Sequence, residues 1–529
     1  MGFRHLSLFA VLTGFSVAIY AGPSTIGGSA GFPLDDAWIH QTYARNLAES
    51  GQLAYVSGQP SAGSTAPLWT LLIAIGYKLN VGYRLWTYAL GAGSLALCGW
   101  FVSRLSLRLW PDRPRLALAA GLLCLFEWRL AWAAASGMET VLFAALGLAL
   151  IERAARSDAH PSDGLIFGVL GGLLTLTRPE GLLLVALASL TWLARSTIRS
   201  QSLSDNLPNA RRGLPNPRHA DGFGNPSRSF LQARLVTASL ASFAILVLPA
   251  AWLNLQASGT LFPNTFYAKQ QEYAVYFSSV TDWLPRALDV IGAPFVGAQV
   301  LLAPGFVLEA FLSLRALRDR STWARALPSV WVAAHLAAYA ARLPVTYQHG
   351  RYLIPVIPVI LLVGLHVSAR LIERIGWFRH LEMPPTVLRR VAAGSLIGAA
   401  AAFWIVGAGA YRVDVNIIES ELVASARWIQ ANTPPGALIA AHDIGAIGYF
   451  ARRPLLDLAG LISPEVIPII RDEASLLALM RARGADFFAA PPDFYSTLLD
   501  APELEQVFKG TSPFAPKHWL VFRAVWQSP

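Results

Sequence analysis

The chain has 529 residues, of which 54% are hydrophobic and only 14% are charged. Soluble globular proteins carry about 25% charged residues, so this composition excludes a soluble enzyme, a disordered regulator and a conventional nucleic-acid binder. The formal net charge is +10, but the basic residues lie in short clusters between apolar runs, as in the cytoplasmic loops of membrane proteins. The sequence therefore predicts an α-helical polytopic membrane protein.

Apolar runs of about 20 residues indicate membrane-spanning helices. The first run follows Arg4 and has no small-residue cleavage site directly after it, so we expect an uncleaved anchor. The run Pro67–Leu79 is too short for a full span and follows a Gly/Ser-rich loop, so we expect a re-entrant or interfacial helix. The eleven predicted spans are 5–22, 85–103, 116–135, 137–152, 164–177, 181–194, 235–255, 287–312, 327–342, 351–370 and 391–411.

Five arginine clusters lie between these spans, and all fall on one side of the membrane only if Pro67–Leu79 does not cross it. The positive-inside rule makes that side the cytoplasm, which puts the N-terminus inside and residues 412–529 outside. Ser200–Ser229, rich in Asn, Pro, Gly, Ser and Arg, is predicted to be a flexible cytoplasmic loop. The clusters contain Arg104, Arg108, Arg113 and Arg115; Arg153 and Arg156; Arg195 to Arg234; Arg315, Arg318, Arg320 and Arg325; and Arg370 to Arg390.

Hydropathy falls after Tyr411, and the pattern becomes that of a small α/β domain of about 115 residues, large enough for its own core. Helices are predicted at Glu419–Gln430 and Glu473–Arg483. Short strands are predicted at Ala437–Ala441, Pro454–Leu458, Asp486–Ala490 and Trp519–Val525. Under the predicted topology this domain is extracytoplasmic.

The first predicted outer loop contains two adjacent carboxylates, Asp35 and Asp36. Such a pair repels unless a cation, a metal or an acceptor hydroxyl offsets it, and a member with a raised pKa can serve as a general base. The alternative is an exposed acidic N-cap for the helix that follows.

Four later outer turns carry further polar side chains. Each alone is compatible with a structural turn that has interfacial aromatic residues and a snorkelling base. Together they place carboxylates in the early loops and cations in the later ones, and ionisable groups at membrane ends tend to mark substrate sites. Sugar transfer from a lipid-linked phosphate needs a base for the acceptor hydroxyl and cations for the leaving phosphate. The residues are Glu139, Arg178, Glu180, Asn264, Tyr267, Lys269, His349 and Arg351.

Several motifs of the chain occur together in one membrane superfamily. They are Asp35-Asp36-Ala-Trp-Ile, Gly63-Ser-Thr-Ala-Pro-Leu-Trp69, Thr177-Arg-Pro-Glu-Gly181, Pro263-Asn-Thr-Phe-Tyr-Ala-Lys269 and Asp443-Ile-Gly-Ala-Ile-Gly-Tyr449. Over most of its length the chain resembles the GT-C glycosyltransferases, in a bacterial branch with arabinofuranosyltransferase-like and protein-mannosyltransferase-like members. The resemblance implies a transmembrane catalytic domain over residues 1–411 and an extracytoplasmic α/β domain over 412–529.

The resemblance also implies an activity and roles. The activity is inverting transfer of a hexose or pentose from a polyprenyl-phosphate donor to a glycan, lipid or protein, on the outer face of the cytoplasmic membrane. Asp35 matches the superfamily's usual candidate base, with Asp36 as the second choice. Arg178 and Lys269 would face the donor phosphate, and the next candidates are Arg351 and His349.

The remaining motif residues are candidates for substrate contact, each with a structural alternative. Tyr43 and Trp69 would stack on sugar rings or belong to the interfacial aromatic belt. His442 and Asp443 would contact the acceptor or form a turn after a strand. The other candidates for substrate contact are Glu139, Glu180, Asn264 and Tyr267.

No cofactor is required by these motifs. Asp35 and Asp36 with Glu139 would form an oxygen site for Mg²⁺ or Mn²⁺ in the GT-C enzymes that use a metal, and no His/Cys cluster indicates zinc. The main competing function is a transporter or flippase of a lipid-linked sugar. Transporters place polar residues near the bilayer midplane, whereas these predicted spans are nearly free of charge.

Overall fold

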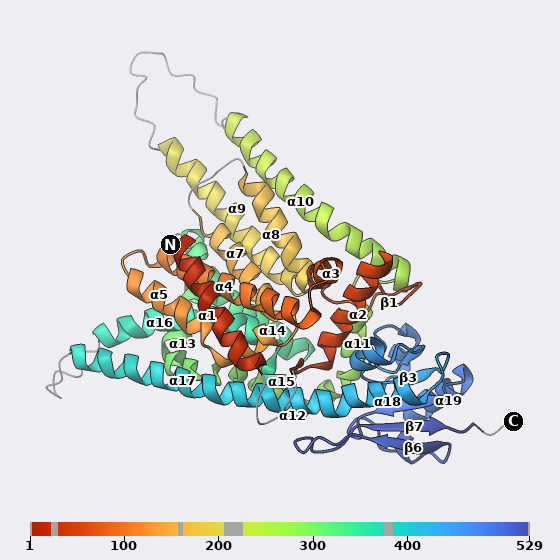
Figure 1. Cartoon of the computed structure of the whole chain (residues 1–529). Coiled ribbons are helices and arrows are strands. Elements are labelled where there is room, and N and C mark those ends of the chain that lie inside the picture. Colours follow the sequence, from red (N-terminus) through yellow and green to blue (C-terminus); the bar gives the residue numbers. More distant parts are fainter. Residues whose placement is uncertain (1–2, 23–29, 157–161, 206–225, 375–384, 527–529) are drawn as a thin grey trace, which may run out of the picture.

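The computed structural model describes residues 3–22, 30–156, 162–205, 226–374 and 385–526. The helices form a bundle, and a small domain with a β-sheet packs at one end of it, beside α2 and α11 (Figure 1). The helices of the bundle are α1 (Phe3–Ala21), α2 (Asp35–Ser50), α3 (Pro67–Lys78), α4 (Tyr83–Leu109), α5 (Pro114–Leu125), α6 (Trp128–Ala135), α7 (Thr140–Ala154), α8 (Asp163–Thr177), α9 (Gly181–Asp205), α10 (Pro226–Ser258), α11 (Asn264–Glu272), α12 (Val280–Gly292), α13 (Ala303–Ala316), α14 (Trp323–Arg342), α15 (Tyr347–Gly350), α16 (Ile357–Arg374) and α17 (Pro385–Ile417).

Six helices among the described residues are long and apolar enough to cross a membrane, which agrees with a polytopic membrane protein. The span predicted at 116–135 is instead a pair of helices, α5 and α6, bent by 52°, which would add a seventh crossing. Several other helices are apolar but shorter, among them α8. The number of eleven crossings stays a prediction.

The span predicted at 287–312 is wrong as a single helix. Helix α12 ends at Gly292, two short 3₁₀ turns follow, and α13 begins only at Ala303. Proline removes a backbone donor and blocks the preceding turn, and Pro294 stands at the first break. Gly297 has φ of 140°, a conformation outside any helix. These residues interrupt an apolar run that hydropathy alone reads as continuous.

Helix α3 lies at one end of the bundle, and its re-entrant or interfacial placement in a membrane stays a prediction. It is 12 residues long, and both of its ends contact the same end of the bundle. Near its start, the Trp69 indole N–H donates to the Gly137 carbonyl at 2.8 Å. Near its end, the Tyr77 hydroxyl donates to Gln41 of α2 at 2.8 Å. A helix that crossed the bundle would separate these two contacts.

The predicted basic loops meet at the other end of the bundle. Glu152 of the second loop pairs with Arg104 and Arg108 of the first. Arg113 pairs with Glu373, which stands beside the fifth loop, at 2.6 Å. The flexible loop predicted at 200–229 is shorter than expected, because α9 continues to Asp205 and α10 begins at Pro226. Residues 206–225 of that loop lie outside the described residues.

The C-terminal domain contains a five-stranded sheet in the order β4-β3-β5-β7-β6. Strand β3 is parallel to both β4 and β5, whereas β7 is antiparallel to β5 and β6. The strands are β3 (Ile439–Ala441), β4 (Leu455–Asp457), β5 (Phe487–Ala490), β6 (Leu504–Lys509) and β7 (Leu520–Ala524). Four of them fall in the predicted segments. Strand β6 was not predicted: it lies at the edge of the sheet, half of its residues are polar, and it lacks a regular alternation of apolar and polar residues.

The first helix of this domain is continuous with the last helix of the bundle. Helix α17 crosses the predicted boundary at residue 411 and passes through a π-helical segment, Ile418–Val423, into α18 (Ala424–Asn432). The predicted helix Glu473–Arg483 is α19. Outside this domain, β1 (Ala54–Val56) and β2 (Gln59–Pro60) form a hairpin after α2.

Candidate active site

The first of the paired carboxylates binds the C-terminal domain. Helix α2 begins at Asp35, its N-cap is Leu34, and no side chain caps it, so the acidic N-cap alternative is wrong. The Asp35 carboxylate instead accepts hydrogen bonds from the backbone N–H groups of Gly445 at 2.6 Å and Ala446 at 2.8 Å. This contact brings the segment after β3 onto the start of α2.

The second carboxylate binds a cation. Arg351 donates from Nη1 to Asp36 Oδ2 at 2.8 Å and from Nη2 to the Tyr352 hydroxyl at 3.1 Å. The Arg351 side chain is 5% exposed, whereas the Asp36 side chain is 35% exposed. The two adjacent carboxylates therefore have different partners. Asp35 accepts hydrogen bonds from backbone N–H groups, and Asp36 neutralises the buried guanidinium of Arg351.

These partners give the carboxylates different acidities. Burial raises the pKa of Asp35 to about 7, the charge of Asp36 adds to the effect, and the backbone hydrogen bonds oppose it. Burial acts in the same direction on Asp36, but the Arg351 charge and hydrogen bond outweigh it and leave the pKa of Asp36 below its usual value. Asp443 lies near both, and burial together with their charges raises the pKa of its carboxyl well above the usual value. A carboxyl with a pKa near neutral pH is suited to proton transfer.

Lys269 stands beside this group as a further cation, and its ion pair with Glu272 is a long one. Its ammonium lies 5.5 Å from the ring centroid of Tyr273 and 5.9 Å from that of Tyr347. The distance to Glu272 Oε2 is 3.5 Å, which is long for a charge-assisted hydrogen bond. The side chain is 27% exposed, so the ammonium is accessible to an anion.

Arg178 lies deeper and is already paired. It donates from Nε to Glu139 Oε1 at 2.6 Å, and His40 lies 3.2 Å from the other oxygen of Glu139. Its guanidinium lies 5.4 Å from the Tyr352 ring, so it adjoins the Arg351 group. The neighbouring Glu180 accepts a hydrogen bond from Tyr339. Glu139, Arg178 and Glu180 are thus brought near the site in buried pairs, and their roles in donor or substrate binding stay predictions.

His349 is directed elsewhere. Its backbone has φ of 60°, and its ring lies against Trp128 and Trp132. Its Nε2 atom is 2.8 Å from Asp414 of α17. His349 therefore belongs to a separate contact between α6 and α17, and its role at the donor phosphate also stays a prediction.

Several predicted substrate residues hold the site together. Asn264 donates to the Leu461 carbonyl at 3.1 Å, which ties α11 to the C-terminal domain. Tyr43 bonds to Ser61 at 2.7 Å inside the first loop. Trp69 is 1% exposed, and Tyr267 is half-buried in ring contact with Phe266. A role of these residues in substrate binding stays a prediction.

His442 follows β3 directly, a position that the turn and the acceptor-contact alternatives share. It lies 2.9 Å from the Tyr495 hydroxyl and 4.1 Å from the ring centroid of Phe494. Burial, and then the charges of Lys269 and Arg471, lower the pKa of His442 to about 3. The imidazole is therefore neutral at physiological pH.

Sequence reasoning missed three residues at the site, Tyr352, Tyr347 and His40, and it missed Asp414 at the separate His349 contact. Tyr352 bonds to Arg351, and Tyr347 lies 3.3 Å from the Tyr352 hydroxyl. His40 contacts Glu139, and Asp414 contacts His349. Both tyrosines flank the His349–Arg351 turn in the sequence, so their position could have predicted that they belong to the site. No sequence signal pointed to Asp414, because it lies within a helix and is far along the chain from every motif.

The proposed oxygen site for Mg²⁺ or Mn²⁺ does not fit this arrangement. Glu139 is engaged by Arg178 and His40, and Asp36 is paired with Arg351. Within the described ranges, no group of three His, Cys, Asp or Glu side chains is placed to hold a metal ion. Asp35, Asp36 and Glu139 thus do not converge on one point.

Comparisons with known proteins agree with this architecture. Residues 410–526 match a family model described as "Domain of unknown function (DUF8728)", which covers the C-terminal domain. The sequence comparison with curated proteins gives no match.

Solved structures match along nearly the whole chain. ArnT from Cupriavidus metallidurans in the apo state has a TM-score of 0.56 at 15% identity, over 98% of this chain and 97% of that chain. ArnT bound to undecaprenyl phosphate gives 0.55 at 15% identity over the same shares. The oligosaccharyltransferase AglB from Archaeoglobus fulgidus, in complex with an inhibitory peptide and a dolichol-phosphate, gives 0.54 at 12% identity, over 100% of this chain and 75% of that chain. The chain therefore shares its fold with ArnT and AglB, as its resemblance to the GT-C glycosyltransferases implies.

Proposed function

We propose that this protein is a membrane glycosyltransferase that moves a sugar from a polyprenyl-phosphate donor to an acceptor hydroxyl, with inversion, on the outer face of the cytoplasmic membrane. The observation that carries the proposal is the group formed by Asp35, Asp36 and Asp443 with Arg351 and Lys269 at one end of an apolar bundle. This group combines a carboxyl poised near neutral pH with cations for a phosphate. The similar ArnT and AglB structures contain undecaprenyl phosphate and dolichol-phosphate, respectively.

The proposed reaction uses these residues in named roles. Asp35 accepts the proton of the acceptor hydroxyl, whose oxygen forms a bond to the anomeric carbon. The bond from that carbon to the donor phosphate oxygen breaks, and its electron pair leaves with the polyprenyl phosphate. Lys269 and Arg351 stabilise the negative charge that develops on the phosphate. The acceptor is a glycan, a lipid or a protein.

The C-terminal domain has a positioning role in this proposal. Its segment Asp443–Ala446 follows β3 and meets the start of α2 through the Asp35 carboxylate. Asn264 fixes a second segment of the domain against α11, the helix that carries Lys269. The domain thus borders the site on its water-facing side, and an acceptor from the water would reach the site along this domain.

The test is to incubate the purified protein with a panel of polyprenyl-phospho-sugars and to measure release of free polyprenyl phosphate. We expect consumption of one donor, faster when the acceptor is added. Translocation of a lipid-linked sugar across vesicles, with no donor consumed, would instead show a transporter. The inactive comparison is Lys269→Met, which keeps an unbranched side chain and removes the cation proposed to stabilise the phosphate.

A further inference from the structure

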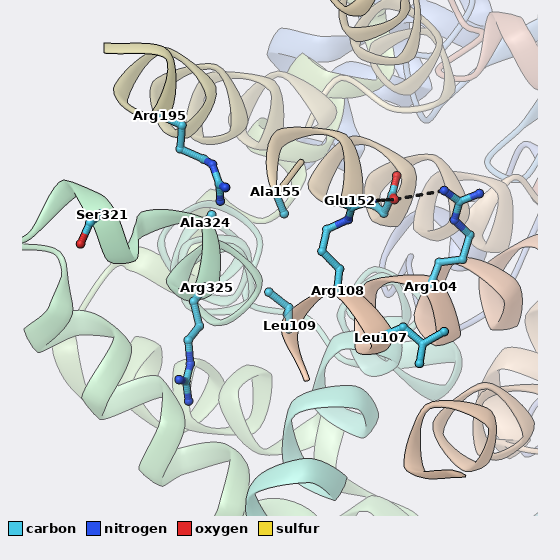
Figure 2. A pocket seen from close by; sticks show the side chains of 10 residues that line it. All are labelled: Arg104, Leu107, Arg108, Leu109, Glu152, Ala155, Arg195, Ser321, Ala324 and Arg325. Atoms are coloured by element: carbon cyan, nitrogen blue, oxygen red, sulfur yellow. Dashed lines mark hydrogen bonds and ion pairs between the residues drawn. The ribbon is translucent and has the colours of Figure 1, made fainter. Parts of the chain in front are cut away.

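A polar cavity lies among the basic loops, at the end of the bundle opposite the candidate active site. Its volume is about 660 Å³. Four arginines line it, with Glu152 as the one carboxylate among the lining residues (Figure 2). We call it the basic pocket; its charged lining residues are Arg104, Arg108, Glu152, Arg195 and Arg325.

The basic pocket and the candidate active site occupy opposite ends of the same helices. Helix α7 begins next to Glu139 and carries Glu152 near its end. Helix α14 carries Arg325 near its start and Tyr339 near its end. At about 1.5 Å per residue, these pairs of residues are about 20 Å apart along the helix axes. Under the predicted topology, the basic pocket therefore opens at the cytoplasmic surface of the membrane.

Positive charge in the basic pocket exceeds what the described residues neutralise. Glu152 is shared by Arg108 at 3.0 Å, Arg104 at 3.3 Å and Arg156 at 3.5 Å. Arg325 lies 3.2 Å from Glu309. Figure 2 shows Arg195 extending from α9 with no such partner, and it forms no ion pair with any described residue.

Hydrogen-bond donors are also in excess. The Nε atom of Arg108 is buried and has no hydrogen-bond partner in the described part of the chain. A buried donor without a partner costs free energy comparable to a lost hydrogen bond. Like charges held around a cavity repel unless an anion lies between them. The positive-inside rule accounts for arginines at the predicted cytoplasmic end of the bundle, but it does not require that they surround a cavity.

We propose that the basic pocket binds a phosphate group, supplied by the headgroup of an anionic phospholipid or by a soluble phosphate. Planar guanidinium groups match phosphate oxygens in pairs of hydrogen bonds. Basic pockets between membrane helices on the cytoplasmic side bind anionic lipid headgroups. We expect the phospholipid to be the source, because the pocket lies where the predicted spans end at the membrane surface.

The test compares a pocket variant, Arg108→Gln with Arg195→Gln, with a charge-matched control, Arg318→Gln with Arg320→Gln. Both control arginines are exposed at the same end of the bundle and do not line the basic pocket. Each purified protein is titrated with phosphatidylglycerol and with phosphatidylcholine, read by native mass spectrometry, and with inorganic pyrophosphate, read by calorimetry.

We expect the parent and the control to bind phosphatidylglycerol in preference to phosphatidylcholine, and the pocket variant to bind it about tenfold more weakly or worse. Pocket-dependent binding of pyrophosphate without phosphatidylglycerol would support the phosphate site with a soluble source. Equal binding of every probe by the pocket variant and the control would overturn the proposal. If the double variant does not fold, Arg195→Gln alone takes its place in the same titrations. This single substitution breaks no ion pair with a described residue, so the test stays decisive.

Discussion

Asp36 and Arg351 are 315 residues apart in the chain, yet their side chains form an ion pair at 2.8 Å. The pair joins the first predicted outer loop to the turn before α16 and places a buried guanidinium at the carboxylate cluster. Tyr352 and Tyr347 extend the same group toward Lys269. The contact therefore builds a site with acidic and basic sides from segments that the sequence keeps far apart.

The first prediction is a pH dependence that follows from Asp35. A general base works only when ionised, so a pKa of about 7 predicts that kcat/KM rises with pH up to about 7 and levels above it. Asp35→Asn should remove this acid limb and lower transfer by about a hundredfold or more. The measurement is a pH–rate profile of donor consumption for parent and variant.

The control separates catalysis from docking, because Asp35 also holds the backbone of Gly445 and Ala446. Tyr55→Phe removes a hydrogen bond to Ile444 in the same segment without touching the carboxylates. We expect Tyr55→Phe to keep most activity and the acid limb. If Asp443→Asn abolished the limb while Asp35→Asn retained it, Asp443 would be the base.

The second prediction concerns the leaving phosphate. Lys269→Met should lower turnover by about 10²–10³, the usual cost of losing one preorganised electrostatic group. Its partner Glu272 is buried, so the unfolding temperature of the variant is measured beside its turnover to separate loss of the cation from loss of folding. Full turnover by a folded Lys269→Met protein would place the phosphate elsewhere. Arg342→Gln, at the exposed end of α14, is the charge-matched control.

The third prediction distinguishes Arg178 from Lys269. Arg178→Ala leaves the buried Glu139 without its main partner, and breaking one side of a buried pair costs about 3–5 kcal/mol. We expect a large fall in the unfolding temperature, measured in detergent. Removing both charges with Arg178→Gln and Glu139→Gln should recover much of that loss. A fully stable Arg178→Ala protein would contradict a structural role for the pair.

The fourth prediction concerns topology. Cysteines placed at Ser204, at the end of α9, and at Glu505, on β6, should react with an impermeant thiol reagent from opposite sides of the membrane. The two natural cysteines, Cys98 and Cys124, are buried and give a low background. Labelling of both new cysteines from one side would reject the predicted arrangement of spans.

Much of the fold could be predicted from the sequence because it depends on local composition. Long apolar runs can bury themselves only in lipid or in a bundle, so α1 appears close to its predicted bounds, and α4, α10 and α17 contain their predicted spans but extend beyond them. Alternation and turn residues likewise predicted most of the C-terminal sheet. The single helix predicted at 287–312 was wrong because hydropathy is insensitive to a backbone break such as that at Gly297.

The sequence by itself determined which chemical groups the outer loops present, since Asp35, Asp36, Lys269 and Arg351 are visible as polar exceptions between apolar runs. Only the tertiary structure decided what each group contacts. Asp35 and Gly445 are 410 residues apart, and no local pattern encodes which of two adjacent carboxylates meets a backbone N–H and which meets a guanidinium. The physical reason is that pKa and pairing depend on burial and on charges within a few ångströms, and those distances exist only after the chain has folded.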